Sequence, residues 1–583
     1  ILGNVTVSGS AASTITGGSW FNINPTTTYT VADVTGSSAT DLLVNTSLRG
    51  PVGSPDTTYN PAAIIKEGAG TMEVTVHSYF RGGLTLNGGT LKLSGGNGGY
   101  GFFDGAVTVN SGTTLTINSD GTGFGYNGGW KPTSVNIVGG TVNGGGNHVW
   151  GISGGVNMTG GLLQSDGFQW NYTGLTTHAS ADTATIVGPL NLRGDGGYST
   201  LSANVANGAA ATDLLISGNI TQGNGSLGIA KSGAGAMTLS GNNSYSGQTD
   251  IQAGTLIAAS STALGVGGHN GGTMTFIQDG ATLALQGGVS LDEHFHVWGS
   301  GVGGLGAVRS ISGNNALTNA PGGGAGYALR SNTTVGVDAD TLTVSGFYNG
   351  DGGSYALTKI GAGTLELTAN SSHTGGTTVN AGALRLAAYG GNGRVSGVLT
   401  VNSGATLETT GDGTGLGYFD QLTTLNVNSG TATSAGAMHI WNLTGGINLT
   451  GSTLQSNSGV SNPSGPQLEW NRTSVTTLAS ATSSTIGGRI NIRGDNGYTT
   501  VDLTVADGAA ATDLAITAAI TEAAGGRGIA KHGPGTMVLS GNNSFTGATT
   551  VNDGLVIVQN GNGIGDLSNV TLNNSSQLRL DAN

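Results

Sequence analysis

One block of 31 residues occurs four times in this chain without a gap, at residues 63–93, 228–258, 356–386 and 528–558. Five columns of the block hold the same residue in every copy. In the first copy these are Lys66, Gly68, Gly70, Gly82 and Gly89, and the later counterparts of the lysine are Lys231, Lys359 and Lys531. A repeat of this length predicts a fold in which one short unit is stacked on the next.

The block has the pattern of short strands separated by turns. Met72, Val74 and Val76 alternate with polar residues, so one face of this segment is apolar, and segments 84–86 and 91–93 repeat the alternation. We expect the repeated glycines to form sharp turns with positive φ. One coil cannot bury its apolar face alone, whereas stacked coils can. The pattern predicts an all-β, parallel β-solenoid, an elongated rod with coils of about 20–30 residues and roughly 20–29 rungs.

A longer repeat is superimposed on the short one. Residues 105–258 match 397–558 in order: HVW at 148–150 corresponds to HIW at 439–441, and NLRGDGGY at 191–198 corresponds to NIRGDNGY at 491–498. This repeat predicts three solenoid segments, listed here in chain order: a partial unit at 1–104, a unit at 105–396 and a second, truncated unit at 397–583. The chain starts and stops out of phase with this unit, which predicts either a piece of a longer array or end-to-end assembly of copies.

Composition excludes several classes of protein. Of 583 residues 111 are Gly and none is Cys, so disulfide scaffolds and thiolate chemistry are excluded. The net charge of −13 is spread thinly, and the few Lys and Arg residues form no basic stripe, which argues against nucleic acid as a partner. No apolar run reaches the ~18–20 residues of a membrane helix, so we expect no membrane insertion of this segment.

The four-copy pattern K-x-G-x-G-T/A-M/L-x-L-S-G-N-N-S-Y-x-G-x-T-x-V-x-x-G-x-L resembles the passenger-associated repeat of autotransporters, also called the autotransporter-associated β-strand repeat. The resemblance implies a single-stranded, right-handed parallel β-helix that is exported through an outer-membrane β-barrel. It also implies an extracellular or cell-surface location. The repeat carries no catalytic residues, so the resemblance assigns no catalytic, cofactor-binding or metal-binding residue.

Two short motifs recur with the longer repeat. The tripeptide Arg-Gly-Asp occurs at 193–195 and at 493–495. It could be a cell-attachment motif or a turn that recurs with the longer repeat, and the recurrence favours the turn. His-x-Trp occurs at His148/Trp150, His439/Trp441 and His296/Trp298. We interpret these pairs as a stacked His/Trp ladder that covers the solenoid.

Metal sites have weaker support in the sequence. Asp292, Glu293, His294 and His296 cluster in LDEHFHVWG, and two His residues two apart on a strand share a face and could bind a transition metal. The ladder remains the favoured interpretation there. SDGTG at 119–123 and GDGTG at 411–415 have the look of calcium loops, but carboxylates are too sparse for repeated calcium cages, so turns are favoured.

The remaining candidates are aromatic residues and the repeated lysine. A sugar-binding face could be lined by five aromatic residues, although aromatic cover over the core explains them equally well: Trp130, Trp170, Trp470, Tyr126 and Tyr418. The repeated lysine could be a catalytic base, but we interpret it as a strand-edge charge that limits wrong pairing.

Together these features predict a non-enzymatic, extracellular structural or adhesive solenoid, without cofactors, that acts as a rigid stalk or fibre segment. Its expected partners are other copies of itself, and a cell surface or glycan. The alternative is a polysaccharide-binding or polysaccharide-degrading β-helix. Glycoside hydrolysis needs two carboxylates at a defined separation, and the only adjacent pair is Asp292-Glu293.

Overall fold

Short strands and tight turns make up the computed structural model of this protein, as the repeat predicts. The structure describes residues 3–50, 62–78, 80–95, 102–117, 124, 131–144, 148–266, 274–318, 327–387, 395–410, 414–416, 421–457, 467–565 and 567–581. In these residues the helical elements are three single 3₁₀ turns: η1 (Asp195–Gly197), η2 (Val302–Gly304) and η3 (Asp495–Gly497). None of the described helices is long and apolar enough to cross a membrane.

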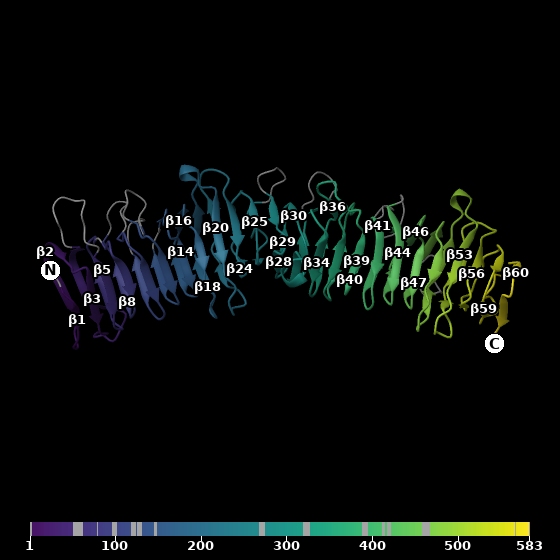
Figure 1. Ribbon diagram of the computed structural model, residues 1–583, viewed down its shortest axis with the longest axis horizontal. Helices are drawn as coiled ribbons and strands as arrows, with labels where there is room; N and C mark the ends of the chain where they lie inside the picture. The colour runs from purple at the N-terminus through teal and green to yellow at the C-terminus, as the bar shows by residue number, and fades with distance from the viewer. Residues whose placement is uncertain are drawn as a thin grey trace. The chain divides into compact units, whose positions relative to one another are not determined.

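The chain divides into two compact units, each described separately here. The first comprises Ile1–Ala284 with Leu291–Glu293, and the second comprises Leu285–Ser290 with His294–Asn583. In both units successive coils place their strands side by side in parallel sheets (Figure 1). The chain forms a parallel β-solenoid of about 21 turns, which confirms the predicted fold class and number of rungs. The predicted segments 1–104, 105–396 and 397–583 remain a prediction from the sequence repeat.

Three sheets form the faces of the first unit. Sheet one contains β1 (Val5–Val7), β3 (Thr26–Val31), β5 (Ala63–Glu67), β7 (Gly83–Leu86), β9 (Val107–Asn110), β11 (Val135–Val138), β14 (Val156–Thr159), β17 (Leu175–Thr177), β20 (Thr200–Val205), β23 (Gly228–Ser232), β25 (Thr249–Ile251) and β27 (Thr275–Ile277). Sheet two contains β2 (Ser13–Asn22), β4 (Thr40–Arg49), β6 (Thr71–Val74), β8 (Thr90–Leu93), β10 (Thr114–Ile117), β12 (Thr141–Gly144), β15 (Leu162–Ser165), β18 (Ala184–Val187), β21 (Leu214–Ile216), β24 (Ala236–Leu239) and β26 (Thr255–Ala258). Sheet three contains β13 (His148–Trp150), β16 (Phe168–Asn171), β19 (Leu190–Leu192) and β22 (Ile220–Gln222).

The second unit repeats this plan. Its sheet one contains β31 (Val308–Ser312), β34 (Thr333–Val337), β37 (Leu357–Ile360), β39 (Thr377–Val379), β41 (Gly397–Val401), β44 (Leu422–Asn428), β47 (Ile447–Thr450), β50 (Val475–Thr477), β53 (Thr500–Val505), β56 (Gly528–His532), β58 (Thr549–Val551) and β60 (Val570–Leu572). Its sheet two contains β32 (Asn315–Leu317), β35 (Thr341–Val344), β38 (Thr364–Leu367), β40 (Ala383–Leu386), β42 (Thr406–Thr409), β45 (Thr431–Ser434), β48 (Thr453–Ser456), β51 (Ser484–Gly487), β54 (Leu514–Ile516), β57 (Thr536–Leu539), β59 (Leu555–Val558) and β61 (Gln577–Leu580). Its sheet three contains β43 (Thr414–Leu416), β46 (Met438–Trp441), β49 (Leu468–Asn471), β52 (Arg489–Ile492) and β55 (Ala519–Glu522). The strands β30 (Phe295–Val297), β33 (Tyr327–Leu329) and β36 (Phe347–Asn349) pair with one another in this order. The remaining strands, β28 (Thr282–Gln286) and β29 (Ser290–Leu291), contain residues of both units.

Strict register places like residues above one another. Leu115 on β10 pairs with Leu91 on β8 and with Val142 on β12, and all three side chains are buried. On the outer face the same register stacks amide side chains of successive coils. Asn402, for example, donates a hydrogen bond to Asn380 across 2.7 Å. Alternation along each strand therefore buries an aliphatic column and exposes a polar one, as period-2 patterning requires.

The repeated glycines have two different physical roles. Gly68 and Gly89 have φ of +78° and +63°, and their counterparts in the other copies are also positive, so the expected turn conformation is confirmed there. At Gly70 and Gly82 the expectation of positive φ is wrong in all four copies. A Cβ at Gly82 would lie 2.7 Å from the Ala63 nitrogen of the preceding coil, so this column is glycine because backbones approach closely.

Candidate functional site

The outer face of sheet three in the first unit brings together the two recurrent motifs. The register pairs His148 with Gln169, and Gln169 with Asn191, on three successive coils. Arg193 follows β19 and its guanidinium lies over the Trp150 ring, 5.6 Å from the ring centroid. A cation held over an indole in this way stabilises both side chains in one arrangement.

Hydrogen bonds fix the same guanidinium from two further directions. Arg193 Nη1 donates to Gln169 Oε1 across 2.9 Å, and Nε donates to Asp195 Oδ2 across 3.0 Å. The His148 and Trp150 rings lie with their centroids 6.1 Å apart on the same strand. We call His148, Trp150, Gln169, Asn191 and Arg193 the first Trp–Arg array. It places an indole beside two amides and a guanidinium, and two hydrogen bonds fix the position of the guanidinium.

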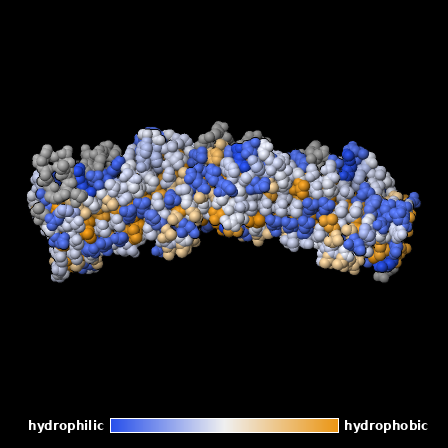
Figure 2. Space-filling model, viewed as in Figure 1, coloured by the Kyte–Doolittle hydropathy of each residue, from blue (hydrophilic) through white to orange (hydrophobic). Residues whose placement is uncertain are grey.

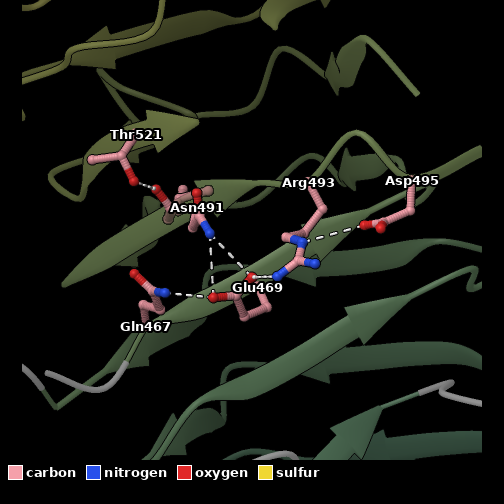
Figure 3. A network of polar contacts seen from close by, with 7 residues as sticks. Gln467, Glu469, Asn491, Arg493, Asp495 and Thr521 are labelled. Carbon is pink, nitrogen blue, oxygen red and sulfur yellow. Dashed lines mark hydrogen bonds and ion pairs between the residues drawn. The ribbon is translucent and has the colours of Figure 1, made fainter. Parts of the chain in front are cut away.

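The second unit contains the corresponding residues, which we call the second Trp–Arg array: His439, Trp441, Glu469, Asn491 and Arg493. Arg493 lies 5.9 Å from the centroid of the Trp441 ring. Its Nη1 donates to Glu469 Oε2 across 3.1 Å, and its Nε donates to Asp495 Oδ2 across 3.2 Å. A network of polar contacts therefore joins β49 to β52 (Figure 3).

One substitution distinguishes the two arrays, because Gln169 in the first corresponds to Glu469 in the second. The Glu469 carboxylate also accepts from Asn491 Nδ2, across 3.2 and 3.1 Å, and from Gln467. Burial disfavours the charge of Arg493, but its hydrogen bonds to Asp495 and Glu469 outweigh that effect and raise its pKa. The second array is thus a charged network around Glu469. The first array has the neutral amide of Gln169 at the corresponding position.

Each unit also has a polar groove along sheet two. In the first unit it holds about 430 Å³ and is lined by Asn143, Gln164, Ser165 and Asp166 among others. In the second unit it holds about 490 Å³, and its lining residues, such as Glu366, Arg385 and Glu408, lie on β38, β40 and β42. The residues that line these grooves include none of the two arrays.

Two of the proposed sugar-binding aromatic residues, Trp170 and Trp470, do not lie on this outer face. Trp170 and Trp470 are buried, and each indole nitrogen donates to a backbone carbonyl, Thr173 at 2.7 Å and Thr473 at 2.8 Å. For these two residues core packing is confirmed and the sugar-binding hypothesis is wrong. Trp130, Tyr126 and Tyr418 lie outside the described residues.

Ring contacts within the His-x-Trp motifs are present in both arrays, and a ladder that continues from coil to coil stays a prediction. Within each array the His and Trp rings are neighbours on one strand, and the ring of Trp150 also lies under Arg193 from two coils onward. Each Arg-Gly-Asp runs into a 3₁₀ turn with positive φ at Gly196 or Asn496, which confirms the predicted turn. Because the Arg and Asp of each tripeptide bind one another, their charges are not presented separately.

The repeated lysine is not a strand-edge charge, so that prediction is wrong. Lys231 lies in β23, which pairs with a strand on either side, and its side chain is fully buried. Its Nζ donates to three backbone carbonyls, Ser232 at 3.1 Å, Gly233 at 2.7 Å and Ala253 at 2.8 Å. The other three copies make equivalent bonds: Lys66, Lys359 and Lys531. Burial lowers the pKa of Lys231 to about 8, and Asp213 opposes this shift.

The proposed metal cluster does not form a ligand set. Glu293 is buried, and burial raises its pKa to about 8, with Asp292 adding to the shift. His296 contacts a cation, because Arg330 Nη2 lies 3.1 Å from its Nδ1. Across the part of the chain that the structure describes, no three His, Asp or Glu side chains are grouped so as to hold a metal. The SDGTG loop and the start of GDGTG lie outside the described residues.

Fold and repeat together define a parallel β-solenoid built from recurring coils. Residues 64–93, 229–258, 357–386 and 529–558 match the family described as Passenger-associated-transport-repeat, which confirms the resemblance seen in the sequence. The chain is similar to the protein named Adhesin BmaC autotransporter from Brucella suis biovar 1 (strain 1330), with 35% identity over 216 residues. That match covers 35% of this chain and 5% of the relative. No solved structure gives a match.

Sequence reasoning missed the pairing of the two motifs and the grooves along sheet two. His-x-Trp and Arg-Gly-Asp are 43 residues apart in the first unit, from Trp150 to Arg193, so no local pattern connects them. The signal that could have found the pairing was their joint recurrence in the longer repeat, at a spacing that corresponds to whole coils.

Proposed function

We propose that this chain is an exported, non-enzymatic passenger segment of the autotransporter type, which forms a surface-displayed solenoid with an adhesive role. The observation that carries the proposal is that all four passenger-type repeats fold as parallel β-solenoid coils, two in each unit, each with its buried lysine. The similarity to an adhesin over 216 residues supports the adhesive role.

The rival function is that of a polysaccharide-degrading β-helix. The second Trp–Arg array argues against turnover, because Arg493 forms an ion pair with both Glu469 and Asp495 and each carboxylate accepts a hydrogen bond from it. A glycosidase needs one carboxyl group held protonated and a second one free to act. Here the carboxylates of Glu469 and Asp495 both bind the guanidinium of Arg493 instead.

We also propose that copies of the chain can associate, because an open edge of a parallel sheet can pair with another strand. Among the described residues the exposed hydrophobic side chains are dispersed, and Figure 2 shows them as separate patches on the viewed face.

The test is expression of the native precursor in its own host. Surface protease treatment, with an antibody against residues 148–266, should release or degrade the segment in intact cells. Cells from which the segment is deleted should adhere less to host surfaces, and the purified chain should release no product from polysaccharides. Protection from external protease, or sustained product release, would contradict the proposal.

A further inference from the structure

One position of the passenger-type repeat holds a fully buried ring in every copy. The first, second and fourth copies have Phe80, Tyr245 and Phe545 there, and the third copy has His373. Of these four rings only the imidazole has an ordinary pKa close to neutral pH. The third copy therefore carries a group that can gain a proton where the other copies carry a phenyl or phenol ring.

The contacts of His373 suit the neutral imidazole. Its Nε2 lies 2.9 Å from Thr377 Oγ1, just as the Tyr245 hydroxyl lies 2.8 Å from Thr249 Oγ1 in the second copy. The Nδ1 of His373 is buried and has no hydrogen-bond partner among the described residues. A neutral imidazole has one N–H donor, whereas the protonated ring has two donors and a positive charge. Protonation would therefore bury a charge together with a donor that has no acceptor, which is unfavourable.

The elements around His373 supply no compensating negative charge. The loop that carries it stacks on β36, because the Ser372 nitrogen donates to the Phe347 carbonyl across 2.9 Å. Strands β36, β39 and β41 contain no Asp or Glu, and the titratable Tyr348 of β36 alternates with the buried Phe347. Lys359 on β37 is buried, but it is a cation and cannot compensate a second positive charge.

Burial accordingly lowers the pKa of His373 from 6.5 to about 4, although the backbone groups of Phe347 and Gly376 oppose the shift. Between these two values the unfolded ring binds a proton and the folded ring does not. The contribution of the neutral ring to stability is complete above about pH 6.5 and is lost as the pH falls through 4.

We infer that the third passenger-type repeat, residues 357–386, is an acid-sensitive coil that opens when His373 gains a proton, while the fourth repeat of the same unit stays closed. The opening is local, because each coil of a solenoid contacts only its neighbours and can unfold without the rest. Mild acid would thus change the solenoid at one defined coil.

The experiment measures hydrogen exchange of the purified 583-residue chain by mass spectrometry at pH 7.5, 6 and 5, corrected for the intrinsic exchange rate at each pH. Protection of residues 357–386 should fall roughly 10- to 30-fold from pH 7.5 to pH 5. Residues 529–558 should keep their protection and serve as the internal control. They also contain a histidine, but His532 is exposed beside Asp502 and can carry its charge in water.

The other copies of the repeat provide the matched variants. His373→Phe introduces the ring of Phe545, and His373→Tyr recreates the pair that Tyr245 forms with Thr249. Both variants should keep the protection of the parent at pH 7.5 and lose the acid-dependent step. The reciprocal variant Phe545→His places an imidazole near Thr549 and should transfer the acid-dependent step to residues 529–558.

Four results would each overturn the inference. The first is the same pH dependence of protection in the parent and in His373→Phe. The second is an acid-dependent step that persists in His373→Tyr. The third is an equal loss of protection in the third and fourth repeats of the parent, and the fourth is a Phe545→His variant whose fourth repeat keeps its protection at pH 5.

Discussion

Lys66 donates a hydrogen bond from its Nζ to the backbone carbonyl of Gly88, 2.9 Å away and 22 residues later in the chain. The same ammonium group binds the carbonyls of Glu67 and Gly68 on its own coil, so it joins two adjacent coils from inside the solenoid. This inter-coil link is present in all four passenger-type repeats. It explains why a cation is retained in a position where an aliphatic residue would otherwise be expected.

Replacing Lys231 by Met should therefore destabilise the first unit by about 1–3 kcal/mol, because the apolar chain fits the space but leaves three buried carbonyls without a donor. Amide hydrogen exchange of residues 228–258 should rise first, since solenoid stability is local. Lys92→Met is the control, because its exposed Nζ binds one carbonyl, and it should change stability by less than about 0.5 kcal/mol. Equal protection of residues 228–258 from hydrogen exchange in both variants would contradict the structural role of Lys231.

Replacing Gly247 by Ala should destabilise the coil by about 1–3 kcal/mol through overpacking. The added Cβ would lie 2.3 Å from the Leu227 carbonyl carbon of the preceding coil, and the rigid backbone cannot move aside locally. Gly174→Ala is the control, because nothing lies within 4 Å of its added Cβ and its φ is not positive. Chemical unfolding monitored by circular dichroism should show a loss for the first variant and none for the second. Similar midpoints would refute the close-approach explanation.

Glu293 should make stability fall as pH rises. Its pKa is about 8 in the folded chain against an ordinary 4.5, so the folded state holds a proton that the unfolded state releases between these values. This contribution to stability is fully present below about pH 4.5 and is lost as pH rises through 8. Glu293→Gln removes the titration. The difference in thermal midpoint, variant minus parent, should increase from pH 5 to pH 8.5. Parallel pH profiles of the two proteins would contradict the raised pKa of Glu293.

Glu469→Gln should weaken the second Trp–Arg array. The Glu469 side chain is 8% exposed and accepts from Arg493, so the neutral amide forfeits a charge-assisted hydrogen bond of about 1–2 kcal/mol. Gln169→Glu is the reciprocal variant, because it creates in the first unit the carboxylate that Arg193 lacks there. We expect it to be neutral or stabilising. Urea unfolding of both variants measures the two changes in the free energy of unfolding. An equal loss of stability in Glu469→Gln and in Gln169→Glu would contradict the correspondence between the arrays.

Much of the fold was predictable because a repeat constrains every coil at once. The alternation of apolar and polar residues at Met72 and Val74 identified strands. The ungapped recurrence of 31 residues predicted stacked coils, since a single coil cannot bury its apolar face alone. The same reasoning failed for the side chain of Lys66. A lysine at a repeated strand position is ordinarily solvated, and only the nearby carbonyls of Glu67, Gly68 and Gly88 make its burial favourable.

The sequence by itself determined the fold class, the number of coils and the turn at each Arg-Gly-Asp, because these depend on local periodicity and on its recurrence. Tertiary structure alone decided which outward residues meet. Arg193 reaches Trp150 only because the stacking register superimposes coils of unequal length, and Trp170 is withdrawn into the core by the alternation of β16. Register depends on the lengths of turns that a strand pattern does not specify. The candidate site therefore became visible only in the folded chain, as a consequence of how many residues each coil contains.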